Sequence, residues 1–82
     1  MKNKERANML TEEEFLKKFG KNIREFREER NMTIDELSII TGIREQYLKR
    51  IEAGKAKRLN TEHLFIFSEA FKLKPHEIVK GL

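Results

Sequence analysis

The chain has 82 residues, 38% of them hydrophobic and 39% charged, with a formal net charge of +4. This length fits one domain, and no apolar run approaches the roughly 20 residues of a bilayer-spanning helix, which excludes a membrane protein. The absence of cysteine excludes disulfide bonds and thiolate metal sites. Because no apolar segment follows the polar residues 1–6, we expect no signal peptide and a cytoplasmic protein.

Start signals mark the predicted helices, and no segment alternates with the period of two that a strand would show. The connections between them are only a few residues long, as in compact helical packing. We expect an all-α domain at residues 10–82, a compact five-helix bundle, preceded by a flexible tail at residues 1–9. The expected helices lie near residues 12–30, 34–41, 45–53, 61–72 and 75–80.

The first helix begins with Thr11 and Glu14 at the spacing of a capping box, in which each side chain bonds the other residue's backbone N–H. Leu10 and Phe15 have the spacing of a hydrophobic staple around this start. One apolar stripe follows along the helix: Phe15, Phe19, Ile23 and Phe26. Gly20 costs roughly 1 kcal/mol inside a helix relative to alanine, so we expect a neighbouring helix to approach it closely.

The second helix repeats the same start, with Thr33 and Glu36 as the box and Met32 and Leu37 as the staple. Gly42 ends it, and the third helix begins within three residues. Two short helices joined by a tight glycine turn form a helix-turn-helix, whose second helix enters the major groove of DNA.

The third helix divides into two opposite faces at about 100° per residue. Tyr47, Leu48 and Ile51 form the apolar face. The polar face carries Glu45, Gln46, Lys49 and Arg50. Arginine or lysine can recognise guanine, glutamine adenine, and glutamate cytosine. A merely solvated face is the alternative, and Glu45 equally fits the preference of acids for a helix N-terminus.

The last two helices have start signals of their own. Asn60 is the expected cap of the fourth helix, while Pro75 and Glu77 occupy the first and third positions of the fifth. The staple pairs around these starts are Leu59 with Leu64 and Leu73 with Ile78, and Ile43 with Leu48 has the same spacing in the third helix.

Phe65 and Ile66 are apolar positions that the core stripe of their helix does not explain, because they lie about 100° and 200° from Leu64. They either extend the small core or form a dimer interface together with Val79 and Leu82. A dimer would read two half-sites, which multiplies discrimination between DNA sequences.

The excess positive charge is concentrated in residues 43–58, where six basic residues face two acidic ones. Such a patch is expected of a protein that binds a polyanion, although a solvated helix face is the alternative. The basic residues are Arg44, Lys49, Arg50, Lys55, Lys57 and Arg58.

No residue pattern indicates catalysis or metal binding. His63 and His76 are 13 residues apart without a carboxylate or cysteine partner at ligand spacing. Neither belongs to a nucleophile motif, and the chain has no glycine-rich phosphate loop. We therefore expect no enzymatic activity, no metal and no cofactor.

Residues 19–79, about three quarters of the chain, resemble the Cro/repressor-type helix-turn-helix family, often called the XRE family. The resemblance rests on residues 23–30, 33–37, 42–43 and 47–54, the last similar to the family's I-S-x-I-E-x-G run. It implies a five-helix domain that usually dimerises on a near-palindromic operator in double-stranded DNA.

The resemblance also implies roles for individual residues. The base-reading positions are Glu45, Gln46, Lys49 and Arg50, and those near the DNA backbone are Arg44, Lys55, Lys57 and Arg58. Arg27 and Glu52 stand where several relatives have an ion pair between the first and third helices. The chain departs from the family at Ile34, where a phosphate-contacting glutamine is frequent, and at Glu45, where glutamine or serine is common.

We therefore predict a sequence-specific DNA-binding transcriptional regulator, such as a repressor of its own operon. Restriction-modification controllers and phage repressors of similar length belong to this class. The alternative is an antitoxin-type module that binds a partner protein and DNA only secondarily. A small toxin-like neighbouring reading frame would favour that alternative.

Overall fold

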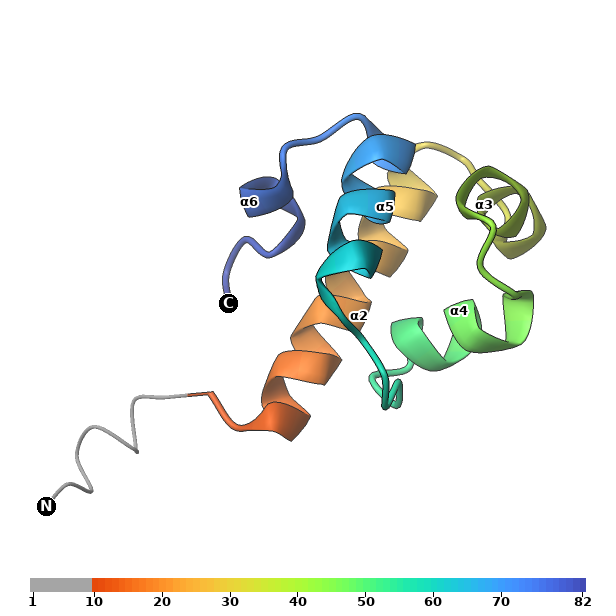
Figure 1. Ribbon diagram of the computed structural model, residues 1–82. Coiled ribbons are helices and arrows are strands. Elements are labelled where there is room, and N and C mark those ends of the chain that lie inside the picture. Colours follow the sequence, from red (N-terminus) through yellow and green to blue (C-terminus); the bar gives the residue numbers. More distant parts are fainter. Residues whose placement is uncertain (1–9) are drawn as a thin grey trace, which may run out of the picture.

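The computed structural model describes residues 10–82, in which five helices and no strand are present (Figure 1). The tail predicted at residues 1–9 lies outside the described residues. α2 and α5 lie at the centre, with α3 and α4 on one side of them and α6 on the other (Figure 1). None of these helices is long and apolar enough to cross a membrane. The helices are α2 (Glu12–Glu29), α3 (Ile34–Thr41), α4 (Glu45–Glu52), α5 (Thr61–Phe71) and α6 (Pro75–Ile78).

Both predicted capping boxes are present. At the start of α2, the Thr11 hydroxyl accepts from the Glu14 N–H and the Glu14 carboxylate from the Thr11 N–H, each at 3.0 Å. At α3, the Thr33 hydroxyl accepts from the Glu36 N–H at 3.0 Å and the Glu36 carboxylate from the Thr33 N–H at 2.9 Å. These local patterns correctly predict where the two helices begin.

The starts of α5 and α6 also agree with the sequence. Asn60 Oδ1 accepts from the His63 N–H at 3.1 Å, and His63 Nδ1 accepts from the Asn60 N–H at 3.2 Å. This second bond completes a box that was not predicted, because the sequence pattern considers only glutamate or glutamine at the third position. α6 has Pro75 first, and the Lys74 N–H donates to Glu77 Oε1 at 2.8 Å.

Four of the five helices end one or two residues before their predicted ends. The chain leaves the helical conformation early after α2 and α5, because Asn31 and Lys72 adopt positive φ angles of 55° and 57°. In α6, the regular helix stops at Ile78, and Val79 has φ −103° and ψ 23°. These differences are of the size expected at fraying helix ends.

The core is built mainly from α2, α4 and α5. Phe67 and Phe71 of α5 are almost completely buried, and their rings stack with centroids 6.0 Å apart. The rings of Phe19 and Phe26 of α2 pack against those of Phe67 and Phe71, with centroid separations of 6.1 Å and 5.7 Å, respectively. The predicted stripe of α2 therefore faces the core, with Phe15 packed at its edge.

Gly20 lies where α4 crosses α2. A Cβ atom at this position would be 2.1 Å from the Ile51 carbonyl oxygen and 2.9 Å from that of Glu52. No side chain fits such a contact, so the glycine lets the two backbones touch. The predicted close approach of a helix is confirmed.

The staple at the start of α2 is the exception among five. Leu10 is 38% exposed, and the first turn of α2 projects beyond the other helices (Figure 1). In the other four pairs, both residues lie in the core or against it. A staple stabilises packing only where the surrounding helices can cover it.

Phe65 and Ile66 of α5 lie in different environments. Phe65 is 56% exposed, so the interpretation that it extends the core is wrong. Ile66 packs against the core and lines a groove with Met32 and Ile40. Adjacent residues of a helix point about 100° apart, and α5 buries only the sector that contains Phe67 and Phe71.

Candidate nucleic-acid interface

The turn between α3 and α4 is fixed by side-chain hydrogen bonds. Gly42 adopts the left-handed conformation with φ 76°, and its N–H donates to the Ser38 carbonyl at 2.8 Å. The Ser38 hydroxyl donates to the Ile43 carbonyl at 2.6 Å. The Ile43 N–H in turn donates to Thr41 Oγ1 at 3.2 Å. The two helices are thereby held in the helix-turn-helix arrangement that the sequence predicts.

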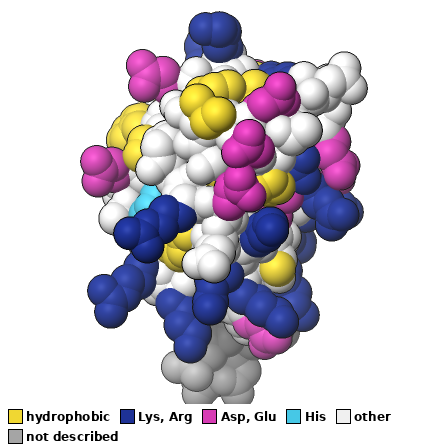
Figure 2. Space-filling view, turned by 90° about the vertical axis from the view of Figure 1, so that its right-hand side faces the viewer, with side chains coloured by type: hydrophobic (Ala, Val, Ile, Leu, Met, Phe, Trp, Pro, Cys, Tyr) yellow, Lys and Arg dark blue, Asp and Glu magenta, His cyan; other side chains and the backbone are white. Residues whose placement is uncertain are grey.

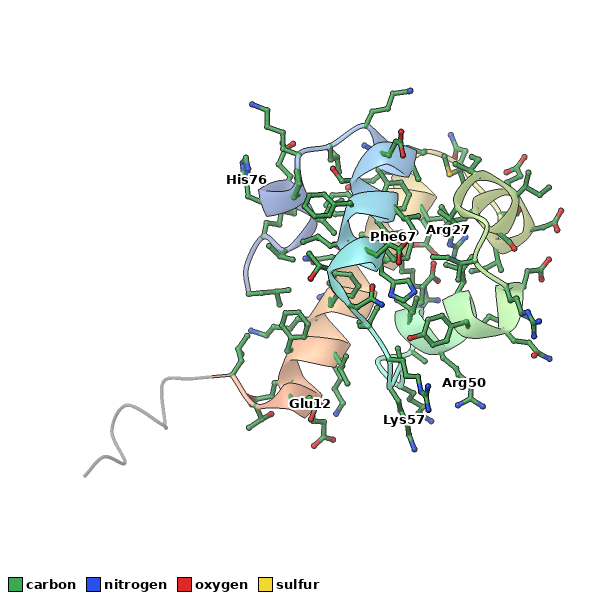
Figure 3. All side chains as sticks on the ribbon, viewed as in Figure 1. Glu12, Arg27, Arg50, Lys57, Phe67 and His76 are labelled. Carbon is green, nitrogen blue, oxygen red and sulfur yellow. The ribbon has the colours of Figure 1, made fainter. Side chains whose placement is uncertain are left out.

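α4 presents the polar face that the helical angles predict. Leu48 and Ile51 are 0% and 1% exposed, which anchors the inner face in the core. Gln46, Lys49 and Arg50 are exposed on the opposite face. Arg50 points away from the body of the protein, so nothing in the described chain covers it (Figure 3).

The ion pair between Arg27 of α2 and Glu52 of α4 lies behind this face. Arg27 donates to both carboxylate oxygens of Glu52, from Nε at 2.7 Å and from Nη2 at 3.0 Å. Their side chains are only 13% and 9% exposed, and hydrogen bonding to Glu52 raises the pKa of Arg27 above its ordinary value. Arg27 Nη1 also donates to the Met32 carbonyl at 2.8 Å, which links α2, α4 and the segment before α3.

The segment after α4, residues 53–60, carries three more of the predicted cations. Lys55, Lys57 and Arg58 are exposed, whereas Ala56 is 1% exposed and packs in the core. Lys57 points to the same side of the protein as Arg50 (Figure 3). We call residues 55–58 the basic loop.

The basic loop begins against the N-terminal half of α2. Gly54 has φ 77°, and a Cβ atom there would lie 2.9 Å from the Cα atom of Lys17. The exposed Lys17 therefore lies beside the loop, and its Nζ atom pairs with the Glu13 carboxylate at 3.6 Å. Sequence reasoning missed it because Lys17 and Lys55 are far apart in the chain, and only the packing of α4 on α2 brings them together.

Tyr47 was assigned to the apolar face of α4 but also makes a polar contact. Its hydroxyl accepts a hydrogen bond from the Arg58 N–H at 3.2 Å. Its ring lies against the His63 ring, with centroids 5.6 Å apart. No local pattern signals these contacts, because the partners are 11 and 16 residues away along the chain.

An acidic pair lies where α3 and α4 meet. Hydrogen bonding with the Asp35 carboxyl raises the pKa of Glu45 above its ordinary value, and desolvation and the negative charge of Asp35 act in the same direction. The positive charge of Lys49 opposes this shift. Sequence reasoning considered Glu45 alone and missed Asp35, because the two residues are ten positions apart and only the packing of α3 against α4 brings the first turns of these helices together.

Charge is divided across the side of the protein formed by α3 and α4. Figure 2 shows lysine and arginine side chains gathered over the lower part of this face, with acidic and hydrophobic side chains above them. The exposed basic residues of α4 and its flanks are Arg44, Lys49, Arg50, Lys55, Lys57 and Arg58. The structure thus leaves all six predicted cations exposed and places Arg50 and Lys57 on the same side of the protein (Figure 3).

The four residues of the predicted dimer interface do not share one surface. Val79 lines an apolar groove with Phe15 and Leu64, and Leu82 packs nearby at the end of the same turn. Ile66 lines a different groove beside α3.

Within residues 10–82, no cluster of three histidine or acidic side chains is arranged to hold a metal ion.

Comparisons with known proteins agree with this geometry. A family model described as a Cro/C1-type HTH DNA-binding domain matches residues 22–80. The crystal structure of the restriction-modification controller protein C.AhdI from Aeromonas hydrophila is similar, with a TM-score of 0.72 and 24% sequence identity. The similarity covers 77% of this chain and 94% of that one. No curated protein matches the chain.

Proposed function

This chain belongs to the Cro/C1-type helix-turn-helix DNA-binding family, and we propose that it is a sequence-specific transcriptional regulator that reads the major groove with α4. The observation that carries the proposal is that Gln46, Lys49 and Arg50 of α4 are exposed while Leu48 and Ile51 on its opposite face are buried in the core. With its side chains, an α-helix is about 10–12 Å across. This diameter fits the roughly 12 Å width of the major groove.

Two groups of side chains have different roles in this proposal. Gln46, Lys49 and Arg50, with Glu45 beside them, contact base edges, where hydrogen-bond donors and acceptors distinguish base pairs. The second group contacts phosphates and sets orientation without reading sequence. It comprises Arg44, Lys55, Lys57 and Arg58, with Lys17 as an addition from α2.

Arg27 and Glu52 act as orienting residues in this proposal. They are nearly buried behind α4 and cannot reach DNA. Because a buried ion pair roughly balances desolvation against attraction, its value lies in fixing the angle of α4 rather than in net stability.

A homodimer on a near-palindromic operator is part of the proposal. Phe65 is 56% exposed on α5, and Leu64 next to it lines the apolar groove with Phe15 and Val79. We place the dimer contact at Phe65 together with this groove, Val79 and Leu82, and assign Ile66 to the α3 side. Sedimentation at micromolar concentration should show a dimer that Phe65→Ser weakens. A strict monomer, both free and bound to DNA, would exclude this interface.

The main experiment is selection of bound sequences from a random duplex DNA pool. Wild-type protein should recover one sequence, near-palindromic if it binds as a dimer. Arg50→Ala should relax the preference at one or two positions, with about 1–3 kcal/mol of lost discrimination. Lys57→Ala should weaken all sequences alike. The reverse pattern would overturn the assignment of roles, and the absence of any enriched sequence would overturn sequence-specific binding.

The antitoxin-type alternative needs a surface for a partner protein. Ile39 and Ile40 of α3 are 75% and 53% exposed, away from the basic loop. Co-expression with the product of a neighbouring reading frame tests this alternative. A stable complex that Ile39→Asp disrupts would support it, whereas independent behaviour of the two proteins would leave DNA binding as the function.

A restriction-modification controller, the class of the Aeromonas protein, fits the proposed role as a sequence-specific transcriptional regulator.

A further inference from the structure

The basic loop is held by a side chain from α4 itself. The Tyr47 hydroxyl accepts a hydrogen bond from the Arg58 N–H at 3.2 Å. Residues 55–58 lie outside every helix, so secondary structure does not fix their backbone. Tyr47 therefore provides a restraint at the end of the loop, where two of its cations, Lys57 and Arg58, are located.

The loop has two further anchors, and the first is the Lys55 N–H, which donates to the Arg50 carbonyl at 2.8 Å. Ala56 is 1% exposed in the core, which directs its neighbours Lys55 and Lys57 outward. The Tyr47 ring is itself supported by His63, whose ring centroid is 5.6 Å away on α5. With Ala56 buried on one side and Tyr47 bonded on the other, Lys57 has little freedom to move away from the surface of α4.

We propose that Tyr47 is a positioning residue for binding of the DNA backbone: its hydroxyl fixes the basic loop so that Lys57 and Arg58 face the phosphates beside α4. This inference rests on the proposed function. A loop that is ordered in advance loses less conformational entropy when it binds. Because phosphate contacts carry no sequence information, Tyr47 controls affinity and leaves base preference unchanged.

Tyr47→Phe removes the hydroxyl and keeps the ring against His63. The probes are the duplex recovered by the random-pool selection and a scrambled duplex of the same length and composition. We expect Kd to rise about three- to tenfold on both duplexes, the range for loss of one hydrogen bond. Hydrogen exchange at the Arg58 amide should accelerate, while the Leu48 amide inside α4 should not change. A shift in the selected sequence would overturn the assignment.

A double-mutant cycle separates positioning from general stabilisation. Lys57→Ala with Arg58→Ala removes the two charges but keeps the Arg58 N–H that bonds Tyr47. In that background, Tyr47→Phe should change Kd less than about twofold, since the two cations that Tyr47 positions are gone and only Lys55 remains in the loop. An equal loss in both backgrounds would show that Tyr47 acts only through overall stability, and the proposal would be wrong.

The same measurements distinguish this inference from the function on which it rests. If the wild-type protein binds neither duplex, the proposed function fails. If the wild-type protein binds and Tyr47→Phe binds equally well, the function stands and only the positioning role is overturned.

Discussion

α3 and α4 are equally long, with eight residues each, and they meet at one turn. Their exposed side chains nevertheless differ in charge and polarity. α4 and the basic loop expose mostly cations and an amide, whereas α3 exposes Asp35, Glu36, Ile39 and Ile40. Figure 2 shows these two surfaces adjacent on one face of the protein. The helix-turn-helix geometry places both helices at the same edge. The side-chain chemistry then determines which of them a polyanion can approach.

The two helices also differ in how they are attached. α4 rests on α2 through backbone contact at Gly20 and through the Arg27–Glu52 ion pair. α3 is held mainly by the burial of Leu37 and by the hydrogen bonds of Ser38 and Thr41 with Ile43 at the turn into α4. We expect the attachment of α4 to be the stiffer of the two, as a helix that presents side chains in a fixed orientation requires.

The largest expected effect comes from removing the charge of the basic loop. A dimer that neutralises about eight phosphates should have a log–log salt slope near −7, losing roughly four orders of magnitude in affinity between 50 and 200 mM salt. The triple variant Lys55→Ala, Lys57→Ala and Arg58→Ala should weaken binding on the order of 10³-fold and reduce the slope by about 3 per protomer. Fluorescence anisotropy across a salt series measures both quantities.

Lys74→Ala is the matched control for this prediction, because it removes one exposed cation next to α6, on the other side of the protein. It should change affinity less than about twofold, since charges beyond a Debye length of about 8 Å are largely screened. An equal loss per charge in both variants would mean that net charge matters more than its location.

The attachment of α4 can be tested through Arg27. Arg27→Ala leaves Glu52 almost buried without its partner, and we expect the free energy of unfolding to fall by about 3 kcal/mol. Urea denaturation measures this loss, and amide exchange should increase more in α4 than in α3. Arg24→Ala is the control, because its pair with Glu28 is exposed and is worth less than about 1 kcal/mol. Equal costs for the two variants would contradict the difference in attachment.

The boundary between the two surfaces should respond to pH. The raised pKa of Glu45 means that its proton is retained above the ordinary value of 4.5, where Asp35 and Glu45 no longer repel each other. As pH rises through this raised pKa, the proton is lost, repulsion appears, and both folding stability and DNA affinity decrease. We expect Glu45→Gln to flatten this pH dependence and to raise affinity at neutral pH about threefold. Anisotropy titrations from pH 4 to pH 8, which begin below the ordinary pKa of 4.5, provide the test, and an unchanged pH profile would contradict it.

The smallest effect is expected on the exposed part of α3. The double variant Ile39→Ser and Ile40→Ser should alter DNA affinity less than about twofold and stability by about 0.5 kcal/mol or less, because both side chains are largely exposed. The same anisotropy and urea measurements apply. A marked loss of DNA binding would show that α3 also contacts the duplex with this face.

Much of the fold follows from patterns that are local in the sequence. The Thr11 and Thr33 capping boxes, the apolar stripe of α2 and the glycine turn at Gly42 each depend on residues within about four positions. The faces of α4 follow from its period alone, which explains why the burial of Leu48 and the exposure of Arg50 were predictable.

Contacts between distant residues were not predictable in this way. The pairing of Tyr47 with Arg58 and of Asp35 with Glu45 depends on how helices and loops pack. The partners Arg27 and Glu52 came from the family resemblance, since nothing in a separation of 25 residues indicates an ion pair. Phe65 was predicted wrongly for a related reason. It is hydrophobic but exposed, because hydrophobicity alone does not reveal which side of α5 the small core covers.

The contact at Gly20 has a consequence for how binding preferences can diversify. Main-chain atoms at Gly20 set the distance between α4 and α2. The exposed residues at positions 46, 49 and 50 therefore do not take part in packing α4 on α2. They can be exchanged in combination while the scaffold stays the same. A library randomised at these three positions should therefore yield many well-folded variants with new target sequences, whereas a library that includes position 20 should not.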